Sequence, residues 1–294
     1  MTNQYKQKIA IISDSCGDIS QNDMVKYGIF VLPMQIIIEG TSYRDGVEIN
    51  VEDIYKKMKA GILPKTSTPV LGGMERLMEH LKSQGYTHVL GVMLSASLSG
   101  TSNALRMIAE DFSMESCILS SNQASVGEGA IALQAAIWRE EGLPFREICK
   151  RTKRLTEETA CFFSVDTLEY LAKSGRIGKA TALLGTALNI KPILSFDETG
   201  TIYTAAKARG SKFVEKQLVN LVDLQFAKPE YAGRPYNLLF ADGAFKEGRE
   251  NLMKVVLEKY SQPQNIFTSN IGAALSAHLG DHLLGVGVQF LTMA

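Results

Sequence analysis

The stretch His88–Asn103, HVLGVMLSASLSGTSN, decides the fold. Its first part, His88 to Leu94, is a short apolar run with the length of a buried β-strand. A loop rich in hydroxyl groups, Ser95 to Thr101, follows and leads into Asn103 to Asp111, which has the composition of a helix. A strand, a polar loop and a helix in this order predict one unit of a parallel α/β sheet.

The same alternation continues on both sides of this unit. The apolar segments Lys8 to Ser13 and Cys117 to Leu119 predict two further strands. Apolar residues recur at helical spacing in Met74 to Leu81, and a second helix is expected over Glu128 to Glu141. We therefore predict a mostly parallel sheet with helices on both faces in the N-terminal half.

The C-terminal half has a different pattern, which predicts a second α/β domain with a partly antiparallel sheet. Ile193 to Phe196 and Thr201 to Tyr203 flank a turn and indicate a hairpin. Further elements are expected as two helices and two strands, at Lys212 to Leu224, Lys246 to Tyr260, Tyr236 to Ala241 and Gly285 to Leu291. We place the domains at 1–157 and 158–294, with the boundary near Leu155 to Thr159.

The charge balance argues against a nucleic-acid-binding protein. Lys and Arg together number 31, as do Asp and Glu, so the whole chain has no basic footprint. The longest basic cluster, Lys150 to Arg154, is followed by Glu157 and Glu158, which is typical of a solvated helix face. We expect no nucleic-acid partner.

Cysteine usage and motifs indicate a reduced protein without a metal or cofactor. Four cysteines are widely spaced and form no CxxC pair. The GxGxxG and P-loop patterns are absent as well. Met1 to Lys8 is polar, unlike a secretion signal, and apolar runs such as Ile29 to Ile38 are too short to span a bilayer. We expect a cytoplasmic protein with transient membrane contact at most and no stable membrane anchor.

Two hydroxyl-rich segments are candidate anion sites. Ser95 to Thr101 stands where a parallel strand ends and a helix begins, the position at which open α/β sheets bind ligands. Backbone N–H groups and hydroxyls there suit a carboxylate or a phosphate. Lys65 to Pro69 similarly precedes the helix at Met74. The alternative for both segments is simple N-capping, because Ser and Thr are preferred at that position.

Two cationic side chains could assist such a site. Arg176 follows the helical stretch Leu168 to Lys173 and could hold a carboxylate bidentately, or could be an ordinary surface or C-capping arginine. His278 lies in apolar surroundings, where it is either a ligand or a satisfied core histidine.

Several short motifs, in order along nearly the whole chain, resemble the DegV family. They are Ile12–Ser15, Tyr43–Gly46, Thr66–Pro69, Leu94–Thr101, Leu168–Leu171, Ser174–Ile177, Lys191–Ile193, Lys207–Arg209 and Gly272 with Ala277–Gly280. The resemblance implies a fatty-acid-binding protein that encloses the acyl chain in its N-terminal domain and is closed at the mouth by its C-terminal domain. It also implies a partner, a fatty acid kinase that phosphorylates the presented carboxyl group, so the protein itself is no enzyme.

The resemblance also assigns site residues. Thr66 and the serine loop would bind the carboxylate with His278 behind them, and Arg176 would support this polar mouth. Together the implied ligand contacts are Thr66, Ser67, Ser95, Ala96, Ser97, Arg176 and His278. Lys207 and Arg209 would face the kinase. Ala96 departs from the family pattern, which has serine there as the usual carboxylate ligand. Either Ser95 or Ser97 substitutes for it, or the head group is held differently, or the ligand is not an ordinary fatty acid.

Two other functions remain open at this point. A small-molecule hydrolase or transferase could use the Ser95–Thr101 loop with His278 as base, although no third residue that would orient the base can be found by spacing. A DegV relative with a different ligand would have a pocket too small or too polar for an acyl chain. A long apolar cavity distinguishes a fatty-acid carrier from that relative.

Overall fold

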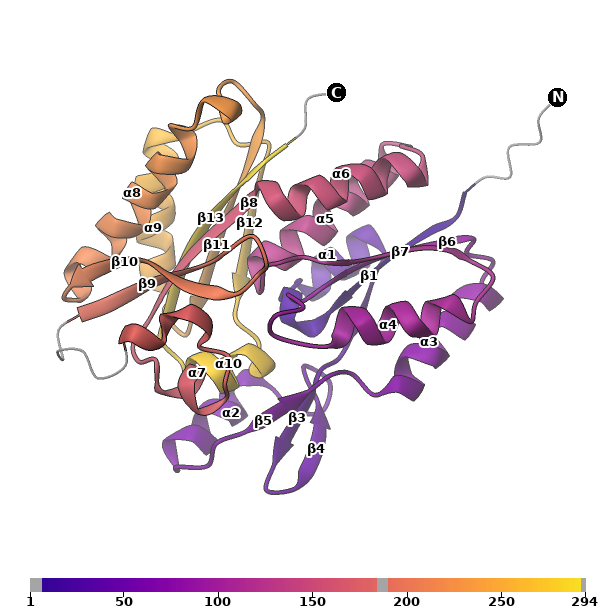
Figure 1. The fold of residues 1–294 in the computed structure, drawn as a ribbon, viewed down its shortest axis with the longest axis horizontal. Coiled ribbons are helices and arrows are strands. Elements are labelled where there is room, and N and C mark those ends of the chain that lie inside the picture. Colours follow the sequence, from indigo (N-terminus) through magenta and orange to yellow (C-terminus); the bar gives the residue numbers. More distant parts are fainter. Residues whose placement is uncertain (1–6, 184–189, 292–294) are drawn as a thin grey trace.

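The computed structural model describes residues 7–183 and 190–291, and it confirms the predicted α/β class (Figure 1). Residues 1–6, most of the polar N-terminal stretch, lie outside this range. The first sheet has the order β2-β1-β6-β7 and is parallel throughout. Its strands are β1 (Ile9–Asp14), β2 (Ile29–Leu32), β6 (His88–Met93) and β7 (Glu115–Ser120).

Helices cover both faces of this sheet, as predicted. Ala10, Ile12 and Met93 pack on one face against α3 and α4, while Ile9 and Ile11 pack on the other against α5 and α6. The helices are α1 (Gln21–Tyr27), α3 (Leu71–Ser83), α4 (Thr101–Glu110), α5 (Val126–Glu140) and α6 (Phe145–Glu158). The alternation of burial along each strand thus places neighbouring side chains in two separate cores.

The second sheet is six-stranded and mixed, with the order β10-β9-β8-β13-β11-β12. Only the β11–β12 pair is parallel. The strands are β8 (Thr159–Val165), β9 (Ile190–Phe196), β10 (Ile202–Arg209), β11 (Tyr236–Gly243), β12 (Asn265–Asn270) and β13 (Leu283–Phe290). Helices α8 (Val214–Phe226) and α9 (Lys246–Lys259) cover its outer face. Helix α6 ends at Glu158, and β8, the first strand of the second sheet, begins at Thr159.

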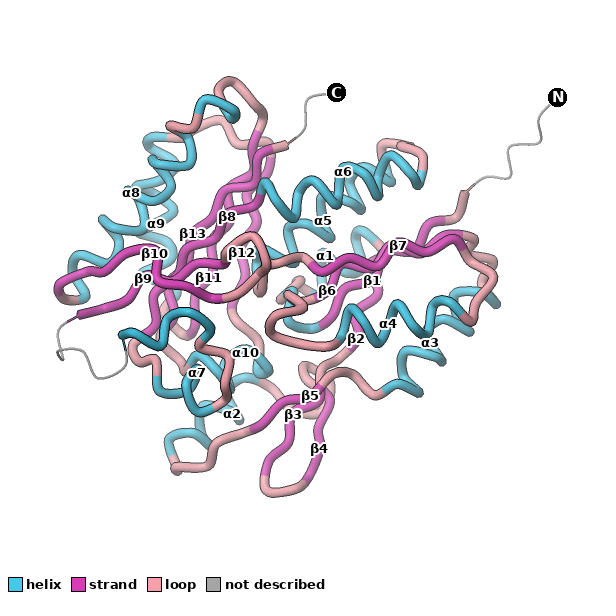
Figure 2. The backbone as a smooth tube through the Cα atoms, in the orientation of Figure 1, coloured by secondary structure: helices cyan, strands magenta, loops and turns pink. Residues whose placement is uncertain are grey.

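Helix α5 lies between the two sheets (Figure 2). Twelve of its fifteen residues are buried, and its sequence is rich in Ala and Gly, which allows close approach on every side. At Gly129 an added Cβ would come within 2.2 Å of the Gly17 carbonyl oxygen in the first half, and at Gly127 within 2.8 Å of the Cys161 sulfur in the second. The small residues of α5 therefore let the two halves form one continuous body.

A third layer, which the sequence analysis did not predict, closes the side of the molecule where the two halves meet. It contains a small antiparallel sheet, β4-β3-β5, and three short helices. Its elements are β3 (Gln35–Ile38), β4 (Thr41–Arg44), β5 (Lys65–Ser67), α2 (Val51–Lys59), α7 (Glu169–Lys173) and α10 (Ala273–Leu279). Because α10 contacts α2, β3 and β5, the end of the chain returns to the N-terminal half.

No helix in the described part of the chain is long and apolar enough to cross a membrane. The four cysteines, Cys16, Cys117, Cys149 and Cys161, are all free thiols.

Candidate functional site

An apolar cavity of about 320 Å³ lies between the two halves, beneath the third layer. Its volume falls at the lower end of the range of about 300–1,000 Å³ for small-molecule sites. The wall is formed by Cys16, Met34, Thr66, Ser67, Thr68, Leu94, Leu98, Ser99, Gly100, Ala124, Phe163, Leu171, Arg176, Phe196, Ile202, Ala274, Leu275, His278 and Leu279. Both halves thus contribute, which differs from the expectation that the N-terminal domain encloses the ligand.

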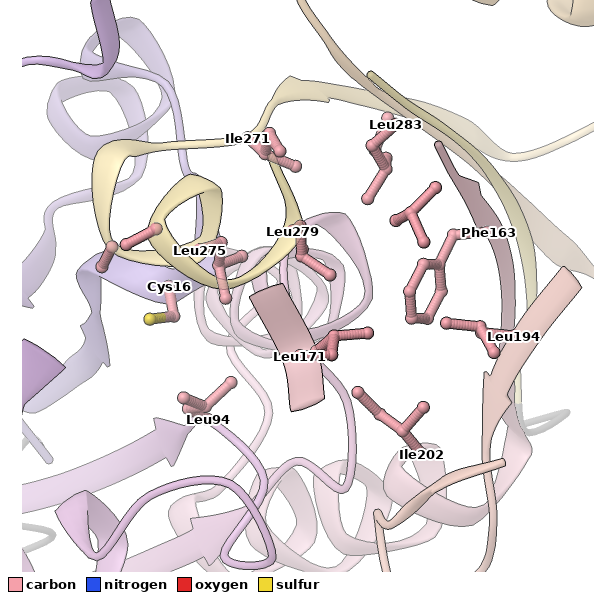
Figure 3. Packing of buried hydrophobic residues seen from close by; sticks show 14 of the residues in the cluster. Cys16, Leu94, Phe163, Leu171, Leu194, Ile202, Ile271, Leu275, Leu279 and Leu283 are labelled. Atoms are coloured by element: carbon pink, nitrogen blue, oxygen red, sulfur yellow. The ribbon is translucent and has the colours of Figure 1, made fainter. Parts of the chain in front are cut away.

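Much of the apolar wall comes from the C-terminal half. In Figure 3 the side chains of Phe163, Leu171 and Ile202 surround the same space, and Leu279 of α10 faces them. Cys16 and Leu94 lie on the opposite side. The side chains belong to one buried hydrophobic cluster, so the cavity is an opening inside a continuous core. An apolar chain placed there would replace water with hydrocarbon contacts on all sides.

The polar end of the cavity is built around a pair that the resemblance predicted. The hydroxyl oxygen of Thr66 lies 2.7 Å from Nε2 of His278. Thr66 is held by β5 and His278 by the last turn of α10, 212 residues later in the chain. The Nδ1 atom of His278 is buried and has no hydrogen-bond partner. A buried imidazole nitrogen without a partner is a costly arrangement that a bound ligand can relieve.

His278 is neutral at physiological pH. Burial and, to a smaller extent, the positive charge of Arg176 together lower the pKa of this imidazole to about 4. The ring therefore contributes a hydrogen-bonding group and no charge in the protein without ligand. Positive charge at this end of the cavity comes from Arg176.

Arg176 lies at the surface near a helix end and also lines the cavity, so its position fits both interpretations of the sequence. Its guanidinium donates to the carbonyl oxygen of Ser174 at 2.6 Å, next to the end of α7, and reaches the carbonyl oxygen of Leu98 at 3.5 Å. The residue also lines the cavity and remains exposed to solvent. Arg176 is thus both a surface arginine held near a helix end and a cation at the polar mouth.

The cavity wall takes Ser99 and Gly100 from the serine loop, together with Leu98. The Ser99 hydroxyl lies 2.8 Å from the Thr101 hydroxyl. From the β5 segment the wall takes Ser67, whose hydroxyl has a long hydrogen bond of 3.3 Å to the Thr68 carbonyl oxygen. Hydroxyl groups are therefore available at the polar end.

Ser95, Ala96 and Ser97 do not line the cavity. The Ser95 hydroxyl donates to the Gly200 carbonyl oxygen at 2.9 Å, and that of Ser97 donates to the Thr199 carbonyl oxygen at 2.7 Å. Ala96 is exposed, and its backbone N–H donates to the Ser120 hydroxyl. Ser95 and Ser97 thus hold the hairpin turn between β9 and β10, and Ala96 contacts the end of β7.

The hydroxyl groups of the two segments, Ser95–Thr101 and Lys65–Pro69, do not cap the helices that follow them. Helix α4 has Gly100 at its N-cap, and α3 has Val70, with no side-chain capping hydrogen bond in either case. Thr66 and Ser67 belong to a strand that pairs with β3. Both segments thus have hydroxyls that are not used to cap the helices that follow them.

The geometry needed for a hydrolase is also absent from the described residues. Ser97 donates to a backbone carbonyl and His278 pairs with Thr66, so the two do not form a nucleophile–base pair. No carboxylate orients His278, because its Nδ1 atom has no partner. A serine without an oriented base is a weak nucleophile. Within the part of the chain that the structure describes, no cluster of His, Cys, Asp and Glu could hold a metal ion.

A second cavity, of about 330 Å³, also reaches the Thr66–His278 pair. It shares Thr66, Arg176 and His278 with the apolar cavity and adds Lys65 and Lys173. The polar pair thus lines both the apolar chamber and a cationic mouth.

The two residues expected to face a partner, Lys207 and Arg209, lie exposed on β10. This strand is at the edge of the six-stranded sheet.

Sequence reasoning missed most of the cavity wall. Phe196 and Ile202 flank the predicted hairpin turn, and Leu275 precedes His278 by three residues, so each stood next to a recognised feature. Their side chains converge only through the tertiary fold. Ser99 was visible inside the quoted loop and could have been included.

Comparison with known proteins gives a consistent result. The family model described as an uncharacterised protein of the DegV family matches residues 8–291. A DegV domain-containing protein from Clostridium acetobutylicum is 35% identical over 281 residues, which cover 95% of this chain and 98% of the relative.

Similar solved structures extend over the whole described fold. A fatty-acid-binding DegV family protein from Thermus thermophilus has a TM-score of 0.89 and 28% identity, covering 97% of this chain and 100% of that one. A stearic-acid-binding protein from Eubacterium ventriosum has a TM-score of 0.86 and 25% identity, covering 97% and 98%.

Proposed function

Because this chain belongs to the DegV family, we propose that it binds a long-chain fatty acid in the apolar cavity and acts as a carrier. The observation that carries the proposal is the cavity itself, an opening in a continuous hydrophobic core with its polar groups gathered at one end. The similar proteins from Thermus thermophilus and Eubacterium ventriosum, described as fatty-acid-binding and stearic-acid-binding, support the same ligand class.

The energetics support such a ligand. Burying the methylenes of a sixteen-carbon acid at ~0.8 kcal/mol each stabilises the complex by about 11 kcal/mol before costs. Association costs of about 4 kcal/mol or more reduce this figure. The remaining ~7 kcal/mol corresponds to a dissociation constant in the micromolar range.

The carboxylate is proposed to lie at the Thr66–His278 pair. A bare carboxylate cannot be buried without donors. A neutral His278 ring leaves one donor of this pair for the carboxylate: the Thr66 hydroxyl when Nε2–H donates to Thr66, or Nδ1–H when Thr66 donates to Nε2. Arg176 supplies the charge. Ser67 and Ser99 are additional hydroxyl donors in the same wall. Ser95, Ala96 and Ser97, which were expected as direct contacts, support the site through the hairpin turn instead.

We further propose that a separate fatty acid kinase phosphorylates the carboxyl group while this protein holds the acyl chain, so that the chain itself performs no chemistry. The cationic mouth leaves Arg176 exposed beside the proposed carboxylate position. Lys207 and Arg209 on the exposed edge strand would contact the kinase. Such a carrier would work in the cytoplasm and would touch a membrane only when it exchanges its ligand.

Native mass spectrometry of the purified protein tests the binding proposal directly. A co-purifying mass of a long-chain fatty acid is expected, and a Leu171→Asp variant, which places a charge in the cavity wall, should lose it. A Leu224→Asp variant is the matched control, because Leu224 is exposed on α8 outside the cavity. A ligand-free mass that persists after incubation with a panel of fatty acids would show that the chain has a different ligand.

A further inference from the structure

A third, smaller chamber of about 40 Å³ adjoins the apolar cavity, and His278 is not part of its wall. The two share Ala124, Phe163, Phe196, Leu275 and Leu279. The remaining wall is almost entirely apolar, and its one hydroxyl, that of Ser125, already donates to Asp18. A chamber of this size has room for a few water-sized groups and no polar partner for water itself.

Phe163 is one of the residues that line both chambers. It contacts the ring of Phe196, with 5.6 Å between the ring centres. Figure 3 shows Phe163 pointing from β8 into the middle of the cluster, toward Leu171 and Leu279. Phe163 is therefore placed to control passage from the large chamber to the small one.

Crowding by neighbouring atoms does not explain why residue 285, in the wall of the small chamber, is a glycine. It lies in β13, in the middle of the six-stranded sheet, where glycine weakens a strand. A Cβ at Gly287 would meet the Cys161 sulfur and the Ala160 carbonyl oxygen at 2.8 Å, so that glycine is required by its neighbours. A Cβ at Gly285 would meet only ordinary contacts of 3.5 Å or more. The missing side chain at Gly285 instead leaves the small chamber open.

We propose that the small chamber receives the methyl end of the acyl chain, and that Phe163 and Gly285 set the chain length that this protein prefers. The inference rests on the proposed fatty-acid binding and adds which residues select among fatty acids. The carboxylate at Thr66–His278 fixes one end, so the ligand can lengthen only toward Phe163. Its last carbons pass that ring and lie over Gly285.

Dissociation constants for saturated fatty acids of increasing length test this inference. In Gly285→Ala the added methyl group occupies the chamber, so acids that reach it should lose about fourfold in affinity for each methylene that no longer fits. Shorter acids should bind as they do to the unchanged protein. Leu284→Met is the control, because Leu284 packs on the opposite face of β13 with the α8 and α9 helices.

Phe163→Leu provides the reverse change, since a smaller side chain joins the two chambers and should shift the preference toward longer acids. An unchanged order of affinities in a Gly285→Ala protein that still binds fatty acids overturns the inference and leaves the proposed function intact. Failure of the unchanged protein to bind any fatty acid overturns both.

Discussion

The side-chain hydroxyl of Ser95 donates a hydrogen bond to the carbonyl oxygen of Gly200, 105 residues away, at 2.9 Å. Ser97 makes the equivalent bond to Thr199, and the Asn122 amide donates to the Glu198 carbonyl oxygen. The loop of the first sheet therefore holds the hairpin turn between β9 and β10. This attachment matters for the cavity because residues on both sides of the turn line it.

Ser95→Ala should destabilise the protein by about 1–3 kcal/mol, because the substitution leaves the Gly200 carbonyl without its buried partner. Urea denaturation followed by circular dichroism measures this change. Ser97→Ala is the matched control: its hydroxyl is exposed, so water replaces the lost bond and the expected cost is about 0.5 kcal/mol or less. Equal losses in the two variants would contradict the role assigned to Ser95.

Gly200→Ala tests the same contact from the other side. Gly200 has a φ of +74°, and an added Cβ would come within 2.1 Å of the Ser95 hydroxyl oxygen. The turn would have to move away from the loop. We expect a larger loss of stability than in Ser95→Ala, together with weaker fatty-acid binding, measured by denaturation and by ligand titration. Unchanged stability would show that the turn is not held at this position.

The sequence predicted the parts of the fold whose signals are local. The strand at β6 and the loop and helix that follow it are adjacent in the chain, so their pattern was sufficient. The hairpin of β9 and β10 could be recognised for the same reason. That Thr66 and His278 belong to one site came only from the family resemblance, because nothing local links residues 212 positions apart.

The third layer could not be predicted because its strands are short and its contacts are distant in sequence. β4 is largely exposed and β5 has only three residues, so neither has the apolar alternation of a buried strand. Helix α10 is seven residues long and is stabilised by packing rather than by its own propensity. The cavity wall depends on this layer, which explains why its apolar residues were missed.

Arg209 is expected to act in partner contact and not in ligand binding. Arg209→Ala should keep the affinity for fatty acid, because the side chain lies on an exposed edge strand outside the cavity wall. With a fatty acid kinase present, acyl-phosphate formation should fall about tenfold or more if this arginine is a hot spot of the interface. Lys254→Ala is the control, since Lys254 is exposed on α9. A kinase rate that responds equally to both changes would contradict the assignment.

The buried carboxyl group of Glu128 is expected to make the protein less stable as the pH rises. Its carboxyl group is fully buried in α5 and accepts hydrogen bonds from the Ser13 hydroxyl and the Asp14 backbone N–H, while its Oε2 atom has no partner. Burial raises its pKa well above the ordinary value, and the negative charge of Asp14 raises it further. A raised folded-state pKa means that the stabilisation is present below the unfolded value of 4.5 and is lost as the pH rises through the folded value.

Glu128→Gln should therefore be more stable than the unchanged protein at pH 8, by about 1–3 kcal/mol. The difference should shrink toward pH 5, where the buried carboxyl group is protonated. Thermal denaturation across this range measures it, and Glu140→Gln, at an exposed position of the same helix, should show no such dependence. A Glu128→Gln variant that is less stable at pH 8 would indicate that the carboxylate is charged and satisfied.

His278 should have the opposite dependence on pH. Its pKa is 6.5 in the unfolded chain and about 4 in the folded protein, where burial and Arg176 disfavour the charged ring. The unfolded state thus binds the proton first, and the stabilisation that is complete above pH 6.5 is lost as the pH falls toward 4. The difference between the two values corresponds to at most about 3 kcal/mol.

His278→Gln keeps a hydrogen-bonding group beside Thr66 but removes the titration, so its loss of stability between pH 6.5 and 4 should be smaller than that of the unchanged protein. His80→Gln, an exposed histidine on α3, is the control. A bound fatty acid brings a negative charge to the imidazole and raises its pKa, so ligand should reduce the loss at low pH in the unchanged protein alone. The same protection in His278→Gln would show that the carboxylate is not held at this residue.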